Sequence, residues 1–144
     1  MYRIILASAS PRRREIMNQI GIRFEVIPSV GEEVITKTEP DKVVCELSAQ
    51  KAAEILEKTE GAVVVLGADT IVAHNGRILG KPVDAEDAKR MIGSYAGDTH
   101  EVFTGVTVLV RDADGTVKKS SFAVRTGVRV RSMSKVEIDW YVAT

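Results

Sequence analysis

The chain has 144 residues, with 20 Lys or Arg against 20 Asp or Glu, and 44% of its residues are hydrophobic. At this length a folded chain buries about 68–70% of its unfolded surface, so its core needs neither disulfides nor a structural metal. Cys45 is the single cysteine, which excludes a disulfide framework and every CxxC zinc or redox site. A formal net charge of zero argues against a general binder of nucleic acid polymers.

The sequence shows no sign of a membrane segment. No run approaches the roughly 18 apolar residues of a spanning helix, and the apolar residues 4–7 are too few for a signal-peptide core. We therefore expect a cytoplasmic protein that makes no membrane contact. Because no repeat or long linker divides the chain, we expect a single domain over residues 1–144.

The hydrophobic pattern predicts strands that alternate with helices. Ser10 and Pro11 are typical of a helix start and Gly21 of a helix end. The pattern predicts helices over about 11–20, 38–58 and 85–92, with a last one after a Ser-x-x-Glu capping box at residue 134. It predicts strands over 3–7, 24–28, 62–66, 70–73, 101–110 and 117–131. The fold class that follows is an α/β domain with a mixed, twisted sheet and flanking helices.

The segment Ser8-Ala-Ser-Pro-Arg-Arg-Arg14 puts three arginines in the first turn of a predicted helix. Each exposed cation there opposes the helix dipole by roughly 0.3–1 kcal/mol, which favours a compensating anion. Backbone N–H groups, the hydroxyls of Ser8 and Ser10 and guanidinium donors at one helix end suit a phosphate. Arginines that merely reach solvent are the alternative. We favour that alternative for Arg14 and a phosphate contact for Ser10 and Arg13.

Three further positions carry candidate chemistry. Asp69 follows a continuous apolar run, and a carboxylate at the carboxyl end of a buried strand can hold a metal or activate water; a turn-forming Asp is the alternative. Lys81 precedes a proline, so an extended backbone can aim its ammonium at a phosphate, although a surface lysine fits equally well. Glu33 can supply a carboxylate to a hard cation, but acidic loop residues are usually solvated.

Four segments, in this order, resemble the Maf family of nucleoside triphosphate pyrophosphatases: Leu6-Ala-Ser-Ala-Ser-Pro-Arg-Arg13, Gly67-Ala-Asp-Thr-Ile-Val72, Gly80-Lys-Pro82 and His100-Glu-Val-Phe-Thr-Gly105. The resemblance spans the chain from Arg3 to Ala143. It implies a fold related to the inosine triphosphate pyrophosphatases, a cytoplasmic location and a homodimer. It also implies hydrolysis of a nucleoside triphosphate to the monophosphate and pyrophosphate with a divalent cation, Mg²⁺ or Mn²⁺.

The resemblance also implies a role for individual residues. Asp69 matches the family's proton acceptor, and Glu33 matches an acidic position that helps to bind the metal together with it. The residues that match phosphate-contacting positions are Ser10, Arg13, Lys51 and Lys81, and Ser8 is a candidate from the chemistry of the helix start alone. Arg12 and Thr70 match the substrate-contacting residues of the branch that prefers dTTP and UTP.

The chain departs from the family pattern at its end. Family members normally continue past Trp140-Tyr-Val-Ala143 into a segment with Asp-Lys-Ala-Gly, a glutamine used in substrate choice and a late Gly-Leu-Pro motif, whereas this sequence stops at Thr144. We therefore expect a Maf-like domain without the C-terminal segment. The alternative function is a catalytically impaired, nucleotide-binding regulatory module linked to cell division, and an inert fragment is a third possibility.

Overall fold

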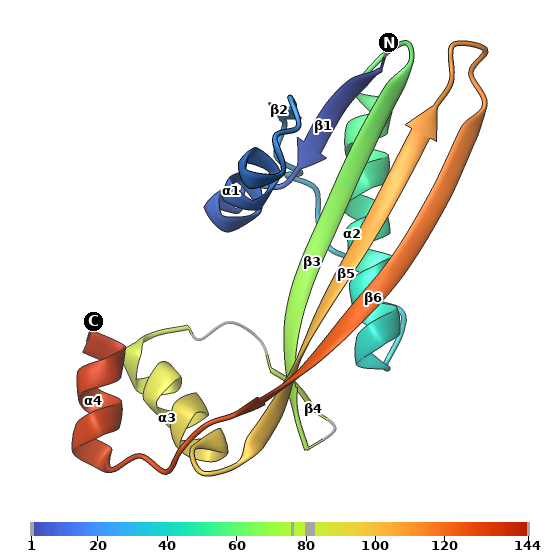
Figure 1. Ribbon diagram of the computed structural model, residues 1–144. Helices are drawn as coiled ribbons and strands as arrows, with labels where there is room; N and C mark the ends of the chain where they lie inside the picture. Colours follow the sequence, from blue (N-terminus) through green and yellow to red (C-terminus); the bar gives the residue numbers. More distant parts are fainter. Residues whose placement is uncertain (1, 76, 80–82, 144) are drawn as a thin grey trace. The chain divides into compact units, whose positions relative to one another are not determined.

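The computed structural model describes residues 2–75, 77–79 and 83–143 (Figure 1). Strands and helices alternate through most of the chain, in the order β1 (Arg3–Ala7), α1 (Pro11–Ile20), β2 (Glu25–Val26), α2 (Pro40–Glu57), β3 (Val63–His74), β4 (Arg77–Leu79), α3 (Ala85–Tyr95), β5 (Thr99–Arg111), β6 (Val117–Arg129) and α4 (Lys135–Ala143). The predicted α/β class, a mixed sheet with flanking helices, is confirmed. In the described ranges, no helix combines the length and the apolar character that crossing a membrane requires.

The described chain forms two compact units. The larger unit contains the chain up to Thr70 together with Thr104–Val124, and the smaller unit contains Ile71–Phe103 and the chain from Arg125 onward. Strands β3, β5 and β6 each contribute residues to both units. A single domain over the whole chain stays a prediction.

The strands of the larger unit follow the order β2-β1-β3-β5-β6. Strand β1 runs parallel to both of its neighbours, and its last residue, Ala7, lies opposite Gly67 of β3. Strand β4 pairs with β3 in the antiparallel direction from Val72 onward. Strand β3 therefore continues beyond the point at which β1 ends.

Helix α2 packs directly on one face of this sheet. Alternate residues are buried in the first part of β3, from Val63 to Gly67, as expected for a strand with one covered face. The core cluster joins β1, α2, β3 and β5 through Ile5, Ala7, Ala52, Ile55, Val63, Val65 and Leu109. Two glycines allow the close approach. A Cβ atom on Gly67 would lie 2.2 Å from the carbonyl oxygen of Ser48, and one on Gly105 would lie 2.3 Å from that of Val44.

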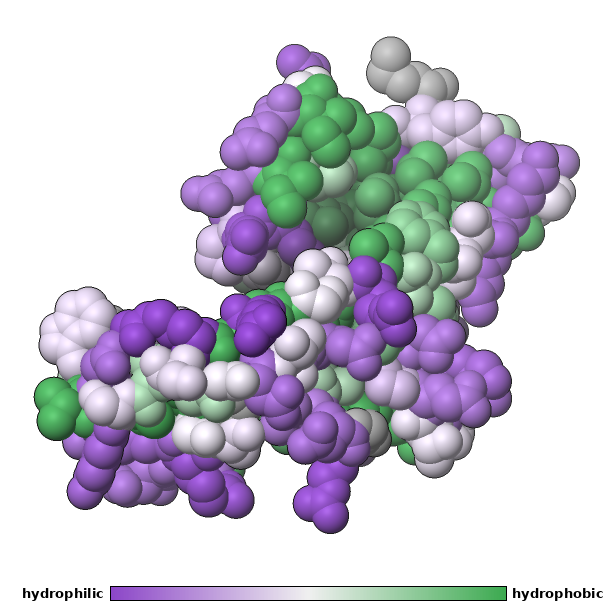
Figure 2. Space-filling model, turned by 60° about the horizontal axis from the view of Figure 1, so that its bottom comes forward, coloured by the Kyte–Doolittle hydropathy of each residue, from purple (hydrophilic) through white to green (hydrophobic). Residues whose placement is uncertain are grey.

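The opposite face of the sheet is more open. Val64 and Leu66 of β3 are partly exposed, while their neighbours Val63 and Val65 are fully buried under α2. The space-filling view shows apolar surface gathered in a hollow on the larger unit (Figure 2). The core of this unit therefore lies between α2 and the sheet.

Helices α1 and α4 begin with the predicted capping chemistry, whereas α2 begins at Pro40 instead of residue 38 and has no side-chain cap. Ser10 caps α1 by accepting from the N–H of Arg13, and Gly21 ends the helix in the left-handed region with φ +81°. In the smaller unit, the predicted capping box of α4 is present, because the N–H of Ser134 donates to Glu137 and the N–H of Glu137 donates to the Ser134 hydroxyl.

The strand predictions were wrong at one place that affects the site. The sequence predicts separate strands over 62–66 and 70–73, with Asp69 after the end of the first and a turn-forming Asp as the alternative, whereas β3 is one strand from Val63 to His74. The reason is packing. Gly67 interrupts the apolar pattern, but the missing side chain is what lets α2 lie against a continuous strand. Asp69 is therefore a strand residue and not a turn residue.

Candidate functional site

The first half of the site lies where β1 leads into α1. Ser8 is 6% exposed, and its hydroxyl oxygen accepts from the backbone N–H of Ser10 at 3.2 Å and from Nη1 of Arg13 at 3.2 Å. Ser10 caps the helix with its side-chain oxygen, so the hydroxyl proton is still available for donation. The short segment between strand and helix thus holds Ser8, Ser10 and Arg13 together.

The second half of the site comes from β3, at residues beyond its pairing with β1. The last β1 partner on β3 is Gly67 and the first β4 partner is Val72. Between them lie Asp69, which is 9% exposed, and Thr70, which is exposed. Because successive strand residues point to opposite faces, Asp69 points toward α2 and Thr70 points toward α1.

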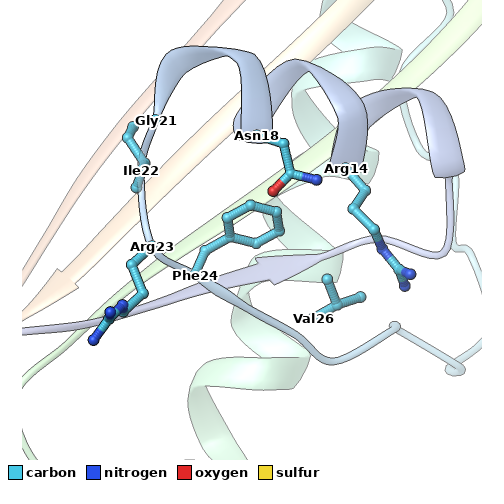
Figure 3. A pocket seen from close by; sticks show the side chains of 7 residues that line it. All are labelled: Arg14, Asn18, Gly21, Ile22, Arg23, Phe24 and Val26. Atoms are coloured by element: carbon cyan, nitrogen blue, oxygen red, sulfur yellow. The ribbon is translucent and has the colours of Figure 1, made fainter.

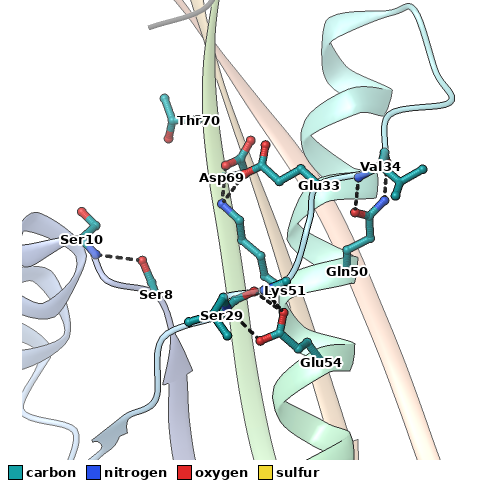
Figure 4. A network of polar contacts seen from close by, with 12 residues as sticks. Ser8, Ser10, Ser29, Glu33, Val34, Gln50, Lys51, Glu54, Asp69 and Thr70 are labelled. Carbon is teal, nitrogen blue, oxygen red and sulfur yellow. Dashed lines mark hydrogen bonds and ion pairs between the residues drawn. The ribbon is translucent and has the colours of Figure 1, made fainter.

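Lys51 of α2 connects two carboxylates at this place (Figure 4). Its Nζ lies 2.6 Å from Oδ1 of Asp69 and 3.4 Å from Oε1 of Glu33. The side chain of Lys51 is 20% exposed, that of Asp69 12% and that of Glu33 51%. The helix can place Lys51 there because the neighbouring Ser48 and Ala52 pack against Gly67, two residues before Asp69.

Arg13 joins the two halves. Its Nη2 donates to Oγ1 of Thr70 at 2.9 Å, and Thr70 in turn lies 3.2 Å from the hydroxyl of Thr104 on β5. Burial lowers the pKa of the Arg13 guanidinium, and the negative charge of Asp69 acts in the opposite direction. The guanidinium still carries its charge, so it is a partly desolvated cation within the electrostatic influence of the Asp69 carboxylate.

The contacts form two groups, which meet at the neighbouring residues Asp69 and Thr70 of β3 and which we together call the polar cluster. One group contains Ser8, Ser10, Arg13 and Thr70, and the other contains Glu33, Lys51 and Asp69. The structure thus brings together seven of the nine predicted site residues. Arg12 is exposed and makes no hydrogen bond or ion pair in the described part of the chain. Lys81 lies outside the described residues.

The cluster suits a hard divalent cation. Within the described ranges no three His, Cys, Asp or Glu side chains are grouped to hold a metal ion. Mg²⁺, however, is commonly held by one or two carboxylates together with substrate phosphates and water. The carboxylates of Asp69 and Glu33 already share one cation, the ammonium of Lys51. The donor chemistry therefore fits Mg²⁺ or Mn²⁺.

Sequence reasoning missed Thr104 and Glu54. Thr104 reaches the cluster through the pairing of β5 with β3, which no local pattern reveals. Glu54 accepts hydrogen bonds from the loop that carries Glu33. The available signal was the repetition of polar residues at positions 46, 50 and 54, one face of the predicted helix.

A separate pocket lies between α1 and the β2 segment. Its volume is about 670 Å³ and its lining consists of Arg14, Asn18, Gly21, Ile22, Arg23, Phe24 and Val26 (Figure 3). The two arginines lie at opposite ends of the pocket with the Phe24 ring between them. The lining contains no carboxylate or imidazole that could take a proton from water, so the polar cluster is the better candidate for hydrolytic chemistry.

The fold of this chain is similar to that of solved structures, one of which is described as a nucleotide pyrophosphatase. A protein of Mycobacterium abscessus described as a nucleoside-triphosphatase and dITP/XTP pyrophosphatase matches with a TM-score of 0.51 and 14% identity, over 87% of this chain and 72% of that one. A HAM1 protein of Coxiella burnetii matches with a TM-score of 0.52 and 14% identity, over 85% of this chain and 72% of that one. At this identity the likeness concerns the fold alone.

The sequence comparisons identify the family. The family model for Maf-like proteins matches residues 3–144, and the chain belongs to this family. A protein of Agathobacter rectalis named dTTP/UTP pyrophosphatase is 45% identical, over 100% of this chain and 76% of its own length. A protein of the same name from Lachnoclostridium phytofermentans is 44% identical, over 99% of this chain and 72% of its own length.

Proposed function

We propose that this protein is a nucleoside triphosphate pyrophosphatase that hydrolyses dTTP and UTP to the monophosphate and pyrophosphate. The observation that carries the proposal is the polar cluster, in which Lys51 pairs with Asp69 and the half-buried Arg13 bonds the adjacent Thr70, beyond the end of β1. The names of relatives at 43–45% identity give the reaction and the substrates. Those names describe enzymes, so they favour this function over the regulatory module.

Arg13 and Lys51 bind the triphosphate in this proposal. Two guanidinium nitrogens of Arg13 already donate to Ser8 and Thr70, and these hydrogen bonds fix the orientation of the guanidinium plane. A phosphate oxygen would then meet a preoriented donor, which reduces the entropy lost on binding. The ammonium of Lys51 is a mobile point charge that can share its protons between Asp69 and a phosphate oxygen. Lys81 is proposed as a further phosphate contact.

Asp69 is proposed as the proton acceptor. A water molecule attacks the α-phosphorus, a proton of that water passes to a carboxylate oxygen of Asp69, and the bond from the α-phosphorus to the bridging oxygen breaks. The products are the nucleoside monophosphate and pyrophosphate. A positioned base of this kind typically contributes about 10²–10⁴-fold to the rate. Neighbouring positive charge, from Lys51 and Arg13, stabilises the charge that develops on the phosphate oxygens.

Asp69 and Glu33 are the residues proposed to hold Mg²⁺ or Mn²⁺. When bound there, the ion supplies charge neutralisation for the triphosphate. Ser8 and Ser10 are proposed to donate to phosphate oxygens at the start of α1, where backbone N–H groups also favour an anion. Arg12 and Thr70 are proposed to contribute to the preference for dTTP and UTP. The proposed location is the cytoplasm, where these substrates are made and used.

One assay tests the function. Purified protein is incubated with dTTP or UTP in the presence of Mg²⁺, and pyrophosphate release is measured beside nucleotide binding. We expect stoichiometric monophosphate and pyrophosphate, and no free orthophosphate. Nucleotide binding without pyrophosphate release would overturn the proposal in favour of the regulatory module. A melting temperature unmoved by nucleotide and Mg²⁺ together would indicate an inert fragment.

A further inference from the structure

The loop that carries Glu33 is held in an unusual way. Residues 29–36 form no helix or strand, and their apolar side chains point outward: Val30 is 78% exposed, Val34 57% and Ile35 54%. Burial of apolar surface therefore does not fix this loop. A segment of this kind is expected to be mobile unless polar contacts hold its backbone.

Glu54 of α2 holds one end of the 29–36 loop. Its carboxylate accepts from the Ser29 hydroxyl at 2.9 Å, from the N–H of Val30 at 2.9 Å and from the N–H of Gly31 at 2.7 Å. The hydrogen bond from the Val30 N–H is the largest cause that lowers the pKa of the Glu54 carboxyl to about 2. The carboxylate is thus charged and multiply bonded throughout the neutral range.

Two more residues of the same helix hold the rest of the loop. The side-chain oxygen of Gln50 accepts from the N–H of Val34 at 3.0 Å, and the side-chain nitrogen of Gln50 donates to the carbonyl oxygen of Val34. Glu46 accepts from the N–H of Thr36 at 2.6 Å and from its hydroxyl. Residues 46, 50 and 54 lie four apart on one helix face, so the loop runs antiparallel along α2. We call these three side chains the α2 clamp.

The position of Gly31 also shows how closely the loop approaches Glu54. A Cβ atom at this position would lie 2.4 Å from Oε1 of Glu54. The cavity between the loop and α2 measures only about 30 Å³, room for about one water molecule. The loop therefore lies directly on the helix and uses a residue without a side chain at the tightest point.

Glu33 lies between the two clamped stretches. Gly31 precedes it by two residues and Val34 follows it directly, and both are bonded to α2. The same helix carries Lys51, whose Nζ is 3.4 Å from the Glu33 carboxylate and 2.6 Å from Asp69 (Figure 4). One helix thus sets the position of both carboxylates relative to each other.

We propose that Glu54, supported by Gln50 and Glu46, is a positioning residue that sets the carboxylate of Glu33 for binding of the divalent cation. The inference rests on the proposed function only in assuming that the protein binds a divalent cation. The contacts of the α2 clamp are present in the chain without a ligand. Glu54 makes no hydrogen bond or ion pair with Asp69 or Lys51 and acts through the loop. Removal of such an orienting group typically costs about 10–100-fold in metal affinity.

The experiment measures Mn²⁺ binding to the full chain without nucleotide, by the loss of the free-ion signal in electron paramagnetic resonance. We expect Glu54→Gln to weaken Mn²⁺ binding by roughly tenfold or more, and to speed hydrogen exchange at the amides of Val30 and Gly31. Glu57→Gln, on an exposed position of the same helix, is the matched control and leaves both readouts unchanged. Gly31→Ala keeps the Glu54 carboxylate but displaces it, and we expect the same weakening.

A double-variant comparison separates positioning from general destabilisation. If Glu54 acts through Glu33, Glu54→Gln has no further effect on Mn²⁺ affinity in a chain that already carries Glu33→Gln. The inference is overturned if Glu33→Gln lowers Mn²⁺ affinity and Glu54→Gln does not, if the two effects add, or if neither variant changes the affinity. These readouts need no turnover, so a chain that shows the clamp but releases no pyrophosphate would refute the proposed function alone.

Discussion

The guanidinium of Arg13 donates to the hydroxyl of Thr70, 57 residues further along the chain, at 2.9 Å. This bond ties the first turn of α1 to the strand residue directly after Asp69. Because β1 ends opposite Gly67, the edge of β3 beside these residues is free of a pairing to β1. The proposed phosphate-binding group and the proposed base are therefore held together by two short segments, each anchored in the sheet.

Replacement of Arg13 by Lys tests the bidentate role of the guanidinium. A lysine keeps the charge but cannot bond Ser8 and Thr70 with two fixed donors and still face a phosphate. Loss of one charged hydrogen bond costs about 1.5–3 kcal/mol, so we expect kcat/KM for dTTP to fall by about 10–100-fold. The measurement is steady-state release of pyrophosphate.

Arg14→Lys is the matched control for this variant, since Arg14 is an exposed arginine of the same helical turn outside the polar cluster. We expect its kcat/KM to stay close to that of the parent chain. Equal losses in both variants would show that the first turn of α1 responds to any arginine replacement, and would remove Arg13 from its assigned role.

Replacement of Asp69 by Asn tests the proton acceptor. The asparagine oxygen can still accept from Lys51, so the fold and nucleotide binding should persist, while the group can no longer take a proton from water. We expect kcat to fall by about 10²–10⁴-fold, with the dTTP affinity measured without divalent cation nearly unchanged. Single-turnover kinetics and equilibrium binding measure the two quantities separately, and Glu60→Gln, an exposed acid, serves as the control. A variant with undiminished turnover would disprove the assignment.

Much of α1 could be predicted because its signals are local. Ser10, Pro11 and Gly21 each act on the backbone within a few residues, and the helix has the bounds that they predict. The contacts of Lys51 with Asp69 and Glu33 could not be derived in the same way. They depend on how closely α2 approaches the sheet, which the sequence records only as Gly67 of β3 and Gly105 of β5. Gly67 looks like a strand break to a pattern that counts apolar residues, and neither glycine announces a helix packed against it.

The α2 clamp could not be predicted for a different reason. Its partners are backbone N–H groups, which every residue possesses, so neither charge pairing nor hydrophobic spacing marks the 29–36 loop as bound. The resemblance to the family identified Glu33 as a functional acidic residue, but it gave no information about which residues fix the position of the Glu33 loop. The contacts between side chains and backbone are therefore the part of this site that only the three-dimensional structure reveals.

Replacement of Gly67 by Ala tests the packing of α2 on β3. The added Cβ would lie 2.2 Å from a backbone oxygen of α2, which cannot move without shifting the helix. We expect a loss of at least about 2 kcal/mol in the free energy of unfolding, which corresponds to a fall in Tm of roughly 5–10 °C. Gly127→Ala is the control, because nothing lies within 4 Å of its added Cβ. Similar stabilities of the two variants in urea unfolding would contradict this account of the helix–sheet contact.

The depressed pKa of Glu54 makes a prediction about acid stability. The carboxyl titrates at about 2 in the folded chain instead of 4.5, chiefly because the Val30 N–H donates to its charged form. A group whose pKa is lower in the folded state contributes stability above its unfolded pKa and loses that contribution as the pH falls through the folded value. The free energy of unfolding of the parent chain should therefore exceed that of Glu54→Gln by a constant amount above about pH 4.5, and the difference should shrink toward zero near pH 2. Urea unfolding across this range measures the difference, with Glu57→Gln as the control for loss of a negative charge from α2. A gap between parent and Glu54→Gln that stays the same down to about pH 2 would mean that the carboxylate does not hold the loop by its charge.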